Sequence, residues 1–218
     1  MAQRLLPDAA EPEPPDLIDR AAVVVSLNHL ALRWKGSTLF GMNSPKFVLQ
    51  FDPSEIPRLA QRYGYQQDDE AFAAGRKIVA GDYSRETLKV IVRWKSARKI
   101  AFIDDNTDAE IAKALRFVCD IRTTEKSAVE TLDGLHGVGV PMASAILTII
   151  NPEKYTVIDV RALESLGLSK WDGSAGFYID YLQACRALAF KYEVSLRTLD
   201  RALWQWSKEN SGQIRSCV

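Results

Sequence analysis

Two residue types that often build chemical sites are scarce in this sequence. It has three cysteines and two histidines among 218 residues. Cys119, Cys185 and Cys217 are odd in number and widely separated, which fits neither a disulfide framework nor the paired spacing of a zinc site. His29 and His136 are too far apart to indicate a metal site. We therefore expect reduced cysteines and no structural metal.

A long apolar run and a secretory leader are also missing. The longest apolar run spans residues 21–32 and contains Asn28 and His29, so it is shorter than the roughly 20 residues that cross a bilayer. The N-terminus has no basic start followed by an apolar core and a small-residue cleavage site. We therefore expect no membrane partner and a cytoplasmic location, associated with the nucleoid if the protein is bacterial.

The formal net charge is zero, which disfavours a protein that coats nucleic acid. The charge is nevertheless uneven. Residues 1–20 carry five acidic and two basic side chains, which leaves +3 on residues 21–218 and indicates a mild preference for anionic partners. Residues 1–16 include the proline-rich, acidic PDAAEPEPPD and are predicted to form a disordered leader. Residues 17–218 are predicted to form one compact helical unit and a monomer.

Apolar residues at three-to-four spacing run through most of the chain and predict helices. FVLQF at 47–51 is the one segment with a strand-like composition. The first helix is expected from Asp16 or Asp19 to about Trp34. The others are expected at about 54–64, 68–80, 84–97, 107–120, 124–134, 141–150, 160–166, 175–192 and 195–209, the last capped by Ser195. The pattern predicts an all-α fold with short connections.

The segment LHGVGVPMASAIL at 135–147 predicts a helix–hairpin–helix. Residues 136–140 form the turn, and Pro141 begins the next helix, where a missing N–H costs nothing. Gly137 and Gly139 allow crowded or left-handed backbone and remove side chains that would block close approach. The exposed amides beside a helix N-terminus attract an anion such as a phosphate. Sequence-independent phosphodiester binding and a plain tight turn between packed helices both remain open.

Asp159 follows the apolar helix MASAILTII and the segment PEKYTVI, and it stands immediately before VRALESLG, which ends at Gly167. Asp is among the best N-cap residues and Gly a good terminator, so one interpretation is structural. The same geometry keeps the carboxylate ionised, because the helix dipole and backbone N–H groups favour the anion. Such a carboxylate could stabilise an oxocarbenium ion or orient a water molecule. Both interpretations of Asp159 remain open.

The hairpin and the aspartate together resemble the signature of the helix–hairpin–helix (HhH-GPD) DNA glycosylase superfamily. That signature is an LPGVG-type hairpin, an apolar helix and a catalytic Asp in a V-D-x-H-like segment. Gly139 and Asp159 are 20 positions apart, the interval usual in the family, and the match covers residues 124–167. The resemblance implies a two-lobed helical fold for residues 17–218 and double-stranded DNA as the partner. It also implies base excision by hydrolysis of the N-glycosidic bond of a flipped base.

The family roles transfer to matching positions of this chain. Asp159 would be the catalytic carboxylate, and a monovalent cation, K⁺ or Na⁺, would bind the carbonyls of Leu135 and Val138. The hairpin that binds the DNA backbone would be Leu135, His136, Gly137, Val138, Gly139 and Val140.

Four departures from the family pattern narrow the expected reaction. Pro141 occupies the position of the Schiff-base lysine, so strand cleavage by that route is not expected. The four-cysteine iron–sulfur motif is missing, and Arg161 and His136 replace the family's histidine and hairpin proline. The resemblance therefore implies a monofunctional glycosylase that leaves an abasic site and requires no cofactor. Its base is either damaged, for a DNA repair role, or a hypermodified phage-type base, for antiviral defence.

The helix expected at 84–97 adds further candidates for a pocket or DNA contact. Arg85, Lys89 and Arg93 are four residues apart on one face, where they either follow a phosphate backbone or are merely solvated. Lys95 falls on the apolar side, where it either reaches the surface or lines a pocket beside Trp94.

Two non-enzymatic alternatives also fit the sequence. In the first, the protein is a noncatalytic helix–hairpin–helix DNA-binding module and Asp159 is only a helix cap. In the second, it is a helical scaffold that binds another protein. The position of Asp159, either facing a cleft with Lys95 or an aromatic wall or buried against its own helix, discriminates between the interpretations.

Overall fold

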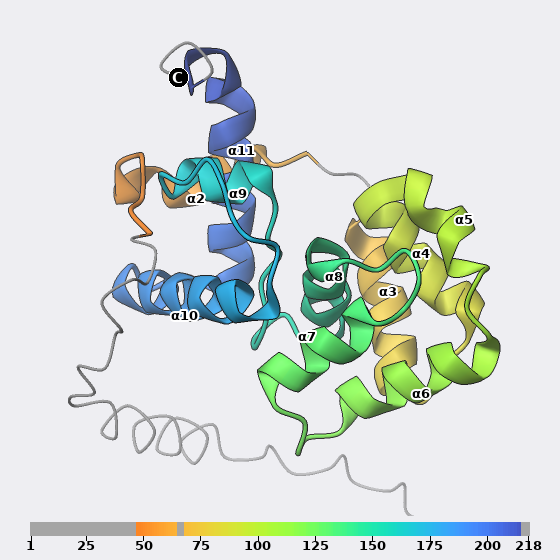
Figure 1. Ribbon diagram of the computed structural model, residues 1–218. Coiled ribbons are helices and arrows are strands. Elements are labelled where there is room, and N and C mark those ends of the chain that lie inside the picture. The colour runs from red at the N-terminus through yellow and green to blue at the C-terminus, as the bar shows by residue number, and fades with distance from the viewer. Residues whose placement is uncertain (1–46, 65–67, 215–218) are drawn as a thin grey trace, which may run out of the picture. The chain divides into compact units, whose positions relative to one another are not determined.

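The structure, a computed structural model, describes residues 47–64 and 68–214, with side chains to residue 210. Every regular element in these ranges is an α-helix or a short 3₁₀-helix (Figure 1). The expected all-α class is therefore confirmed for this part of the chain. The leader at 1–16, the helix expected up to Trp34, and Cys217 lie outside the described residues.

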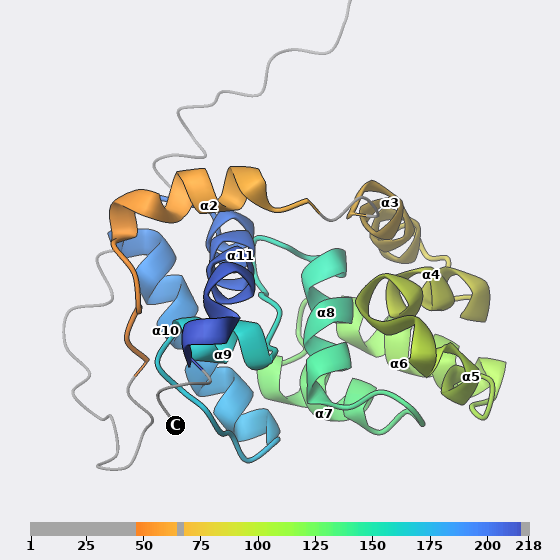
Figure 2. The same ribbon diagram turned by 90° about the horizontal axis from the view of Figure 1, so that it is seen from above.

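The helices form two groups, which lie on opposite sides of Figures 1 and 2. Contacts among α3, α4, α6, α7 and α8 build the first group, and contacts of α11 with α2, α9 and α10 build the second. The first group comprises α3 (Asp68–Val79), α4 (Arg85–Ser96), η3 (Ala97–Lys99), α5 (Ile100–Ile103), α6 (Asp108–Cys119), α7 (Glu125–Asp133) and α8 (Val140–Ile150). The second comprises η2 (Pro53–Glu55), α2 (Ile56–Arg62), α9 (Val160–Ser165), α10 (Ala175–Lys191) and α11 (Leu196–Ile214).

Helix α8 is the most buried helix of the first group. Its sequence VPMASAILTII has no charged residue, and nine of its eleven residues are buried. A helix that is apolar on every side must be surrounded by other elements, and α8 packs against α3, α4 and α7. Gly75 of α3 allows the closest approach, because a Cβ there would lie 2.2 Å from the carbonyl oxygen of Ile149.

Helix α11 organises the second group. Leu196, Leu199 and Leu203 are buried along one face of α11, and the helix packs against α2 and α9. The Ser195 hydroxyl accepts a hydrogen bond from the Thr198 amide at 3.0 Å. The N-cap expected at Ser195 is therefore confirmed.

A buried segment, residues 155–158, connects α8 to α9 and so passes from the first group to the second. Side chains from both groups bind its backbone. The Tyr178 and Tyr181 hydroxyls of α10 donate to the carbonyls of Thr156 (3.0 Å) and Val157 (2.7 Å), and the Ser144 hydroxyl of α8 accepts from the Ile158 amide (3.1 Å). The position of the next residue, Asp159, is therefore held by both groups.

The strand-like segment at 47–51 does not form a strand. The amides of Val48 and Gln50 each donate a 3.0 Å hydrogen bond, to the carbonyls of Leu166 and Ser165 respectively. These carbonyls lie at the C-terminal end of α9, where a helix leaves its last acceptors unpaired. The alternating pattern of FVLQF therefore reflects half-burial against a helix end and not pairing with another strand.

Two short helices, η3 and α5, also differ from the pattern expected from the sequence. The apolar spacing predicts neither η3 nor the four-residue α5, because a single turn is too short to show a helical period. Across the described ranges, 47–64 and 68–214, no helix is both long and apolar enough to span a membrane.

Candidate active site

The helix–hairpin–helix joins α7 to α8. Gly137 has a φ of +82°, and a Cβ there would lie 2.4 Å from Cβ of Phe102. Gly139 instead has an extended backbone with φ −89°, and its nearest neighbour to an added Cβ would be Pro141 at 3.8 Å. Only Gly137 therefore requires glycine for its conformation, whereas Gly139 leaves open surface at the N-cap of α8.

The two hairpin amides are available to a ligand. Within the described residues, the N–H groups of Gly137 and Gly139 have no acceptor, and Gly139 is exposed. Leu135, Val138 and Val140 are buried and anchor the hairpin in the core. The hairpin thus combines backbone donors that have no acceptor in the described residues with apolar side chains that are buried.

Asn106 fixes the hairpin from the α5–α6 connection. Its Oδ1 accepts a 2.7 Å hydrogen bond from the His136 amide, and its Nδ2 donates to the His136 carbonyl at 3.1 Å. Asn106 is itself buried. No local sequence pattern marks Asn106 as a hairpin residue, because its partner lies 30 residues away in the chain.

Three exposed side chains, those of Phe102, Asp105 and His136, and the half-buried Lys99 lie around the hairpin tip. His136 Nδ1 lies 2.8 Å from Oδ2 of Asp105, and its ring meets the edge of Phe102 at a centroid distance of 5.6 Å. Lys99 Nζ lies 5.0 Å from the centroid of the Phe102 ring. A positive charge and an exposed aromatic ring therefore lie beside the hairpin.

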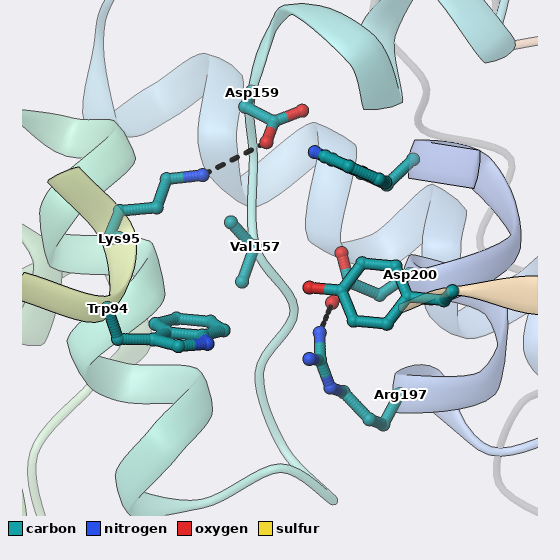
Figure 3. A pocket seen from close by; sticks show the side chains of 8 residues that line it. Trp94, Lys95, Val157, Asp159, Arg197 and Asp200 are labelled. Atoms are coloured by element: carbon teal, nitrogen blue, oxygen red, sulfur yellow. Dashed lines mark hydrogen bonds and ion pairs between the residues drawn. The ribbon is translucent and has the colours of Figure 1, made fainter. Parts of the chain in front are cut away.

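The carboxylate of Asp159 has two different partners. As the N-cap of α9, it accepts a 3.0 Å hydrogen bond from the Ala162 amide at Oδ1. Its other oxygen, Oδ2, lies 3.0 Å from Nζ of Lys95 on α4 (Figure 3). Asp159 therefore caps its own helix and also faces a lysine of the other helix group.

The environment of Asp159 favours its ionised form. Burial raises the pKa of this carboxyl, but the charge of Lys95 and the hydrogen bond from the Ala162 amide lower it by more. The net pKa lies below the ordinary value. A quarter of the side chain remains exposed, so an ionised carboxylate is accessible at neutral pH.

Asp159 and Lys95 open into a cavity of about 250 Å³ (Figure 3). This is slightly smaller than the roughly 300–1,000 Å³ of pockets for drug-sized ligands, and suits a ligand of one aromatic ring system. Three aromatic side chains contribute to the wall. The lining residues are Tyr63, Trp94, Lys95, Val157, Asp159, Arg197, Asp200 and Trp204.

A network of charged side chains supports one wall of the cavity. Arg197 forms ion pairs with both Asp68 and Asp200, and Arg201 binds Asp68 at 2.8 Å. Trp94 Nε1 donates to Asp68 at 2.9 Å. The Arg197 guanidinium also lies over aromatic rings, with distances to the centroids of Tyr63, Trp94 and Phe72 of 5.2, 5.6 and 5.8 Å.

Arg197, Asp200 and Tyr63 line the cavity although no sequence motif marks them as site residues. A signal for Asp200 was present, because it follows Leu196 by four residues on the apolar face of its helix. A carboxylate at such a position is rarely buried without a function or a partner. Nothing in the sequence indicated that Asp68, more than a hundred residues away, supplies the second carboxylate for Arg197.

The basic residues of α4 have different surroundings. Arg85 donates to Asp108 at 2.8 Å and to the carbonyls of Ile103 and Asn106 at 2.6 Å each. Lys89 is ion-paired with Asp104. Arg93 is exposed and has no ion pair within the described residues. Arg85 and Lys89 therefore bind the α5–α6 connection, and Arg93 is the member of the stripe that faces solvent.

Lys95 and Arg161 lie close to the cavity. Lys95 lines it beside Trp94, so the structure brings together the two α4 residues named as pocket candidates. The Arg161 guanidinium lies 5.3 Å from the ring centroid of Trp204, which is also in the wall. Among residues 47–64 and 68–214, no cluster of three His, Cys, Asp or Glu side chains could hold a metal ion.

Comparison with known proteins does not assign this site. No family model, curated protein or solved structure matches the chain.

Proposed function

We propose that this protein is a monofunctional DNA glycosylase with the two-lobed helix–hairpin–helix fold. It would hydrolyse the N-glycosidic bond of a flipped damaged or hypermodified base and leave an abasic site. The observation that carries the proposal is the position of Asp159, whose ionised carboxylate lines an aromatic-walled cavity and faces Lys95. A residue that only capped its helix would not need a cavity or a lysine beside it.

The cavity suits an extruded base. Enzymes that act on a base take it out of the stack and hold it between aromatic or apolar side chains. Trp94, Trp204 and Tyr63 supply such surfaces. As the glycosidic bond breaks, positive charge develops on the sugar, and the Asp159 carboxylate stabilises it and accepts a proton from the attacking water.

The hairpin supports a contact with the DNA backbone. The free amides of Gly137 and Gly139 lie beside the N-terminus of α8, where partial positive charge favours a phosphate. A monovalent cation at the carbonyls of Leu135 and Val138 would neutralise phosphate charge. The Leu135 carbonyl already accepts from the Val138 amide at 3.0 Å, and its second lone pair leaves room for such a cation.

The test is base release from duplex oligonucleotides that carry alkylated, deaminated, oxidised or hypermodified bases. Alkali added afterwards converts abasic sites into strand breaks. We compare wild type with Asp159→Asn, which removes the charge but keeps a good N-cap side chain. Wild type is expected to give alkali-dependent cleavage, and Asp159→Asn to lower the rate at least about 100-fold.

Asp52→Asn is the matched control, because Asp52 also caps a helix, accepting from the Ser54 amide at 2.8 Å, but does not line the cavity. It should keep the wild-type rate.

Strand cleavage without alkali would contradict the monofunctional assignment. Lys95 would then be the candidate for an amine that forms a Schiff base with the sugar.

The main alternative is a noncatalytic DNA-binding module, and the hydrogen bond from the Ala162 amide to Asp159 favours it. In that case no base is released, and wild type and Asp159→Asn bind DNA with equal, salt-sensitive affinity. A protein-binding scaffold would show no salt-dependent DNA affinity at all.

A further inference from the structure

The cavity contains a second carboxyl group, that of Asp200 on α11. Arg197, one turn earlier, binds its Oδ2. In Figure 3 the other oxygen of the carboxyl points away from Arg197. Asp159 and Asp200 reach the same cavity from different helices, so a bound base would have a carboxyl group on more than one side.

Charged and titratable groups surround Asp200 from every neighbouring element. Arg197 is on its own helix, and all the others come from different helices or connections. They are Lys95 from α4, Asp159 at the start of α9, Tyr63 after α2, and Tyr181 and Cys185 from α10. Burial raises the pKa of Tyr63 to about 12, so its hydroxyl stays protonated.

These surroundings act on the two cavity carboxyls in opposite directions. Burial raises the pKa of Asp200 and the negative charge of Asp159 adds to the increase, while Arg197 only partly opposes it. The net pKa of Asp200 lies above its ordinary value, whereas that of Asp159 lies below. Two carboxyls whose environments separate their pKa values are the usual arrangement for one acid and one anion in the same reaction.

The third carboxylate of the network, Asp68, has a different environment. It binds Arg197, Arg201 and the Trp94 indole N–H, and it does not line the cavity. Burial raises its pKa, but Arg197 and these hydrogen bonds lower it by more. Asp68 therefore compensates the charge of the arginines and leaves Asp200 as the carboxyl that faces a ligand.

We infer that Asp200 is the general acid that protonates the leaving base. The inference rests on the proposed glycosylase function. The Asp200 O–H proton moves to a ring nitrogen or carbonyl oxygen of the base while the C1′–N bond breaks and its electron pair stays on the base. Water adds its oxygen to C1′ and gives a proton to the Asp159 carboxylate. Transfer of this proton to Asp200 then returns both groups to their starting states. The products are a neutral free base and an abasic sugar.

Two kinds of leaving base differ in their need for a general acid. A neutral base such as hypoxanthine needs a proton to leave easily, whereas a cationic base such as 7-methylguanine leaves as a neutral molecule without one. General acid catalysis typically contributes about 10²–10⁴-fold to the rate. Only the neutral base should therefore depend on Asp200.

The experiment measures single-turnover release of the base panel, including hypoxanthine and 7-methylguanine, by wild type and Asp200→Asn from pH 4 to pH 9. For neutral bases we expect the variant to be slower by about 100-fold or more. We also expect the wild-type rate to fall as rising pH deprotonates Asp200, and this fall to be absent in the variant. Release of 7-methylguanine should change little.

Asp68→Asn is the matched control, because it removes a carboxylate from the same arginine but from outside the cavity. The ratio of neutral to cationic base release is measured within one sample, so partial unfolding of a variant does not alter it. Asp68→Asn should keep the wild-type ratio.

Two results would overturn the role of Asp200 and leave the glycosylase function standing. In one, Asp200→Asn slows the release of neutral and cationic bases equally. In the other, wild type releases cationic bases alone. A wild type that releases no base, or an Asp159→Asn variant as active as wild type, would overturn the proposed function and the inference with it.

Discussion

The two carboxylate oxygens of Asp159 have different partners, which is why both a capping role and a catalytic role fit this residue. One oxygen accepts the Ala162 amide and caps α9, and the other meets Lys95 in the cavity. Both contacts favour the same ionised carboxylate, so the cap and the proposed catalytic role reinforce each other. Variants that separate charge from capping are therefore more informative at this residue than its deletion.

Lys95→Met should shift the pH dependence of Asp159. Burial raises the pKa of this carboxyl and Lys95 is the largest opposing influence, so the pKa should rise without the lysine. A carboxyl with a lowered folded-state pKa stabilises the fold at neutral pH and loses this contribution as the pH falls through that pKa. In Lys95→Met, acid unfolding measured by circular dichroism and the acid limb of base release should both begin at higher pH.

Lys89→Met is the control on the same helix, because Lys89 pairs with Asp104 and does not line the cavity. In Lys89→Met, the acid limb of base release should stay in place. If it also stayed in place in Lys95→Met, Lys95 would not be the partner that keeps Asp159 ionised.

At the scale of elements, the hairpin and α4 each combine binding groups with structural ones. In the hairpin, Gly137 has a left-handed backbone while Gly139 leaves an open surface. In α4, Arg85 and Lys89 bind the neighbouring connection while Arg93 faces solvent. Residues that look equivalent in the sequence therefore have different expected effects when they are replaced.

Gly137→Ala should destabilise the protein more than Gly139→Ala. An alanine at 137 would have a φ of +82° and a Cβ 2.4 Å from that of Phe102, which together cost about 2–4 kcal/mol. At 139 the backbone is extended and the nearest atom lies 3.8 Å away, so the free energy of unfolding should change by less than about 1 kcal/mol. Urea denaturation measures both, and equal losses would refute the assigned difference.

Arg93→Ala should reduce the salt dependence of DNA binding. Each phosphate neutralised by a basic side chain contributes about 0.9 to the slope of log affinity against log salt, so the slope should fall by about 1. Arg85→Ala should leave the slope unchanged, because its guanidinium binds Asp108 and two backbone carbonyls. Titration of a fluorescent duplex at several salt concentrations distinguishes the two, and equal slopes for Arg93→Ala and wild type would exclude a phosphate contact at Arg93.

At the scale of the described molecule, the cavity wall is also a connection between the two helix groups. Asp68 and Trp94 belong to α3 and α4 of the first group, and Arg197, Asp200 and Arg201 belong to α11 of the second. Burial lowers the pKa of Arg197, but Asp200 and Asp68 raise it by more, so the guanidinium stays charged. The charges that shape the site thus also hold its two sides together.

Arg197→Leu should destabilise the protein by about 3–5 kcal/mol, because it removes the buried counter-charge of the Asp68 carboxylate and the hydrogen-bond partner of Asp200. Arg62→Leu breaks an exposed ion pair with Glu209 and should cost less than about 1 kcal/mol. Thermal and urea unfolding of the two variants provide the comparison. A loss for Arg197→Leu as small as that for Arg62→Leu would show that the buried network contributes little to stability.

Local sequence patterns determined the helices, the hairpin and the cap at Asp159. Apolar residues at helical spacing predicted nine of the described helices, and the glycines and Pro141 predicted the turn between α7 and α8. These features depend on neighbours within a few residues along the chain, so the sequence contains their cause. The segment at 47–51 shows the limit of local patterns. Its composition predicts a strand, but its hydrogen-bond partners lie at the distant C-terminal end of α9, which the local sequence does not encode.

Only the tertiary structure decided what surrounds Asp159. Lys95 lies 64 residues before it in the chain, and Arg197 and Asp200 reach the cavity from the last described helix. Asn106 meets the hairpin and Asp68 meets Arg197 through contacts that no local pattern encodes. The energy of a buried charge depends on the distance and orientation of its partners, and these are defined only when the two helix groups pack together.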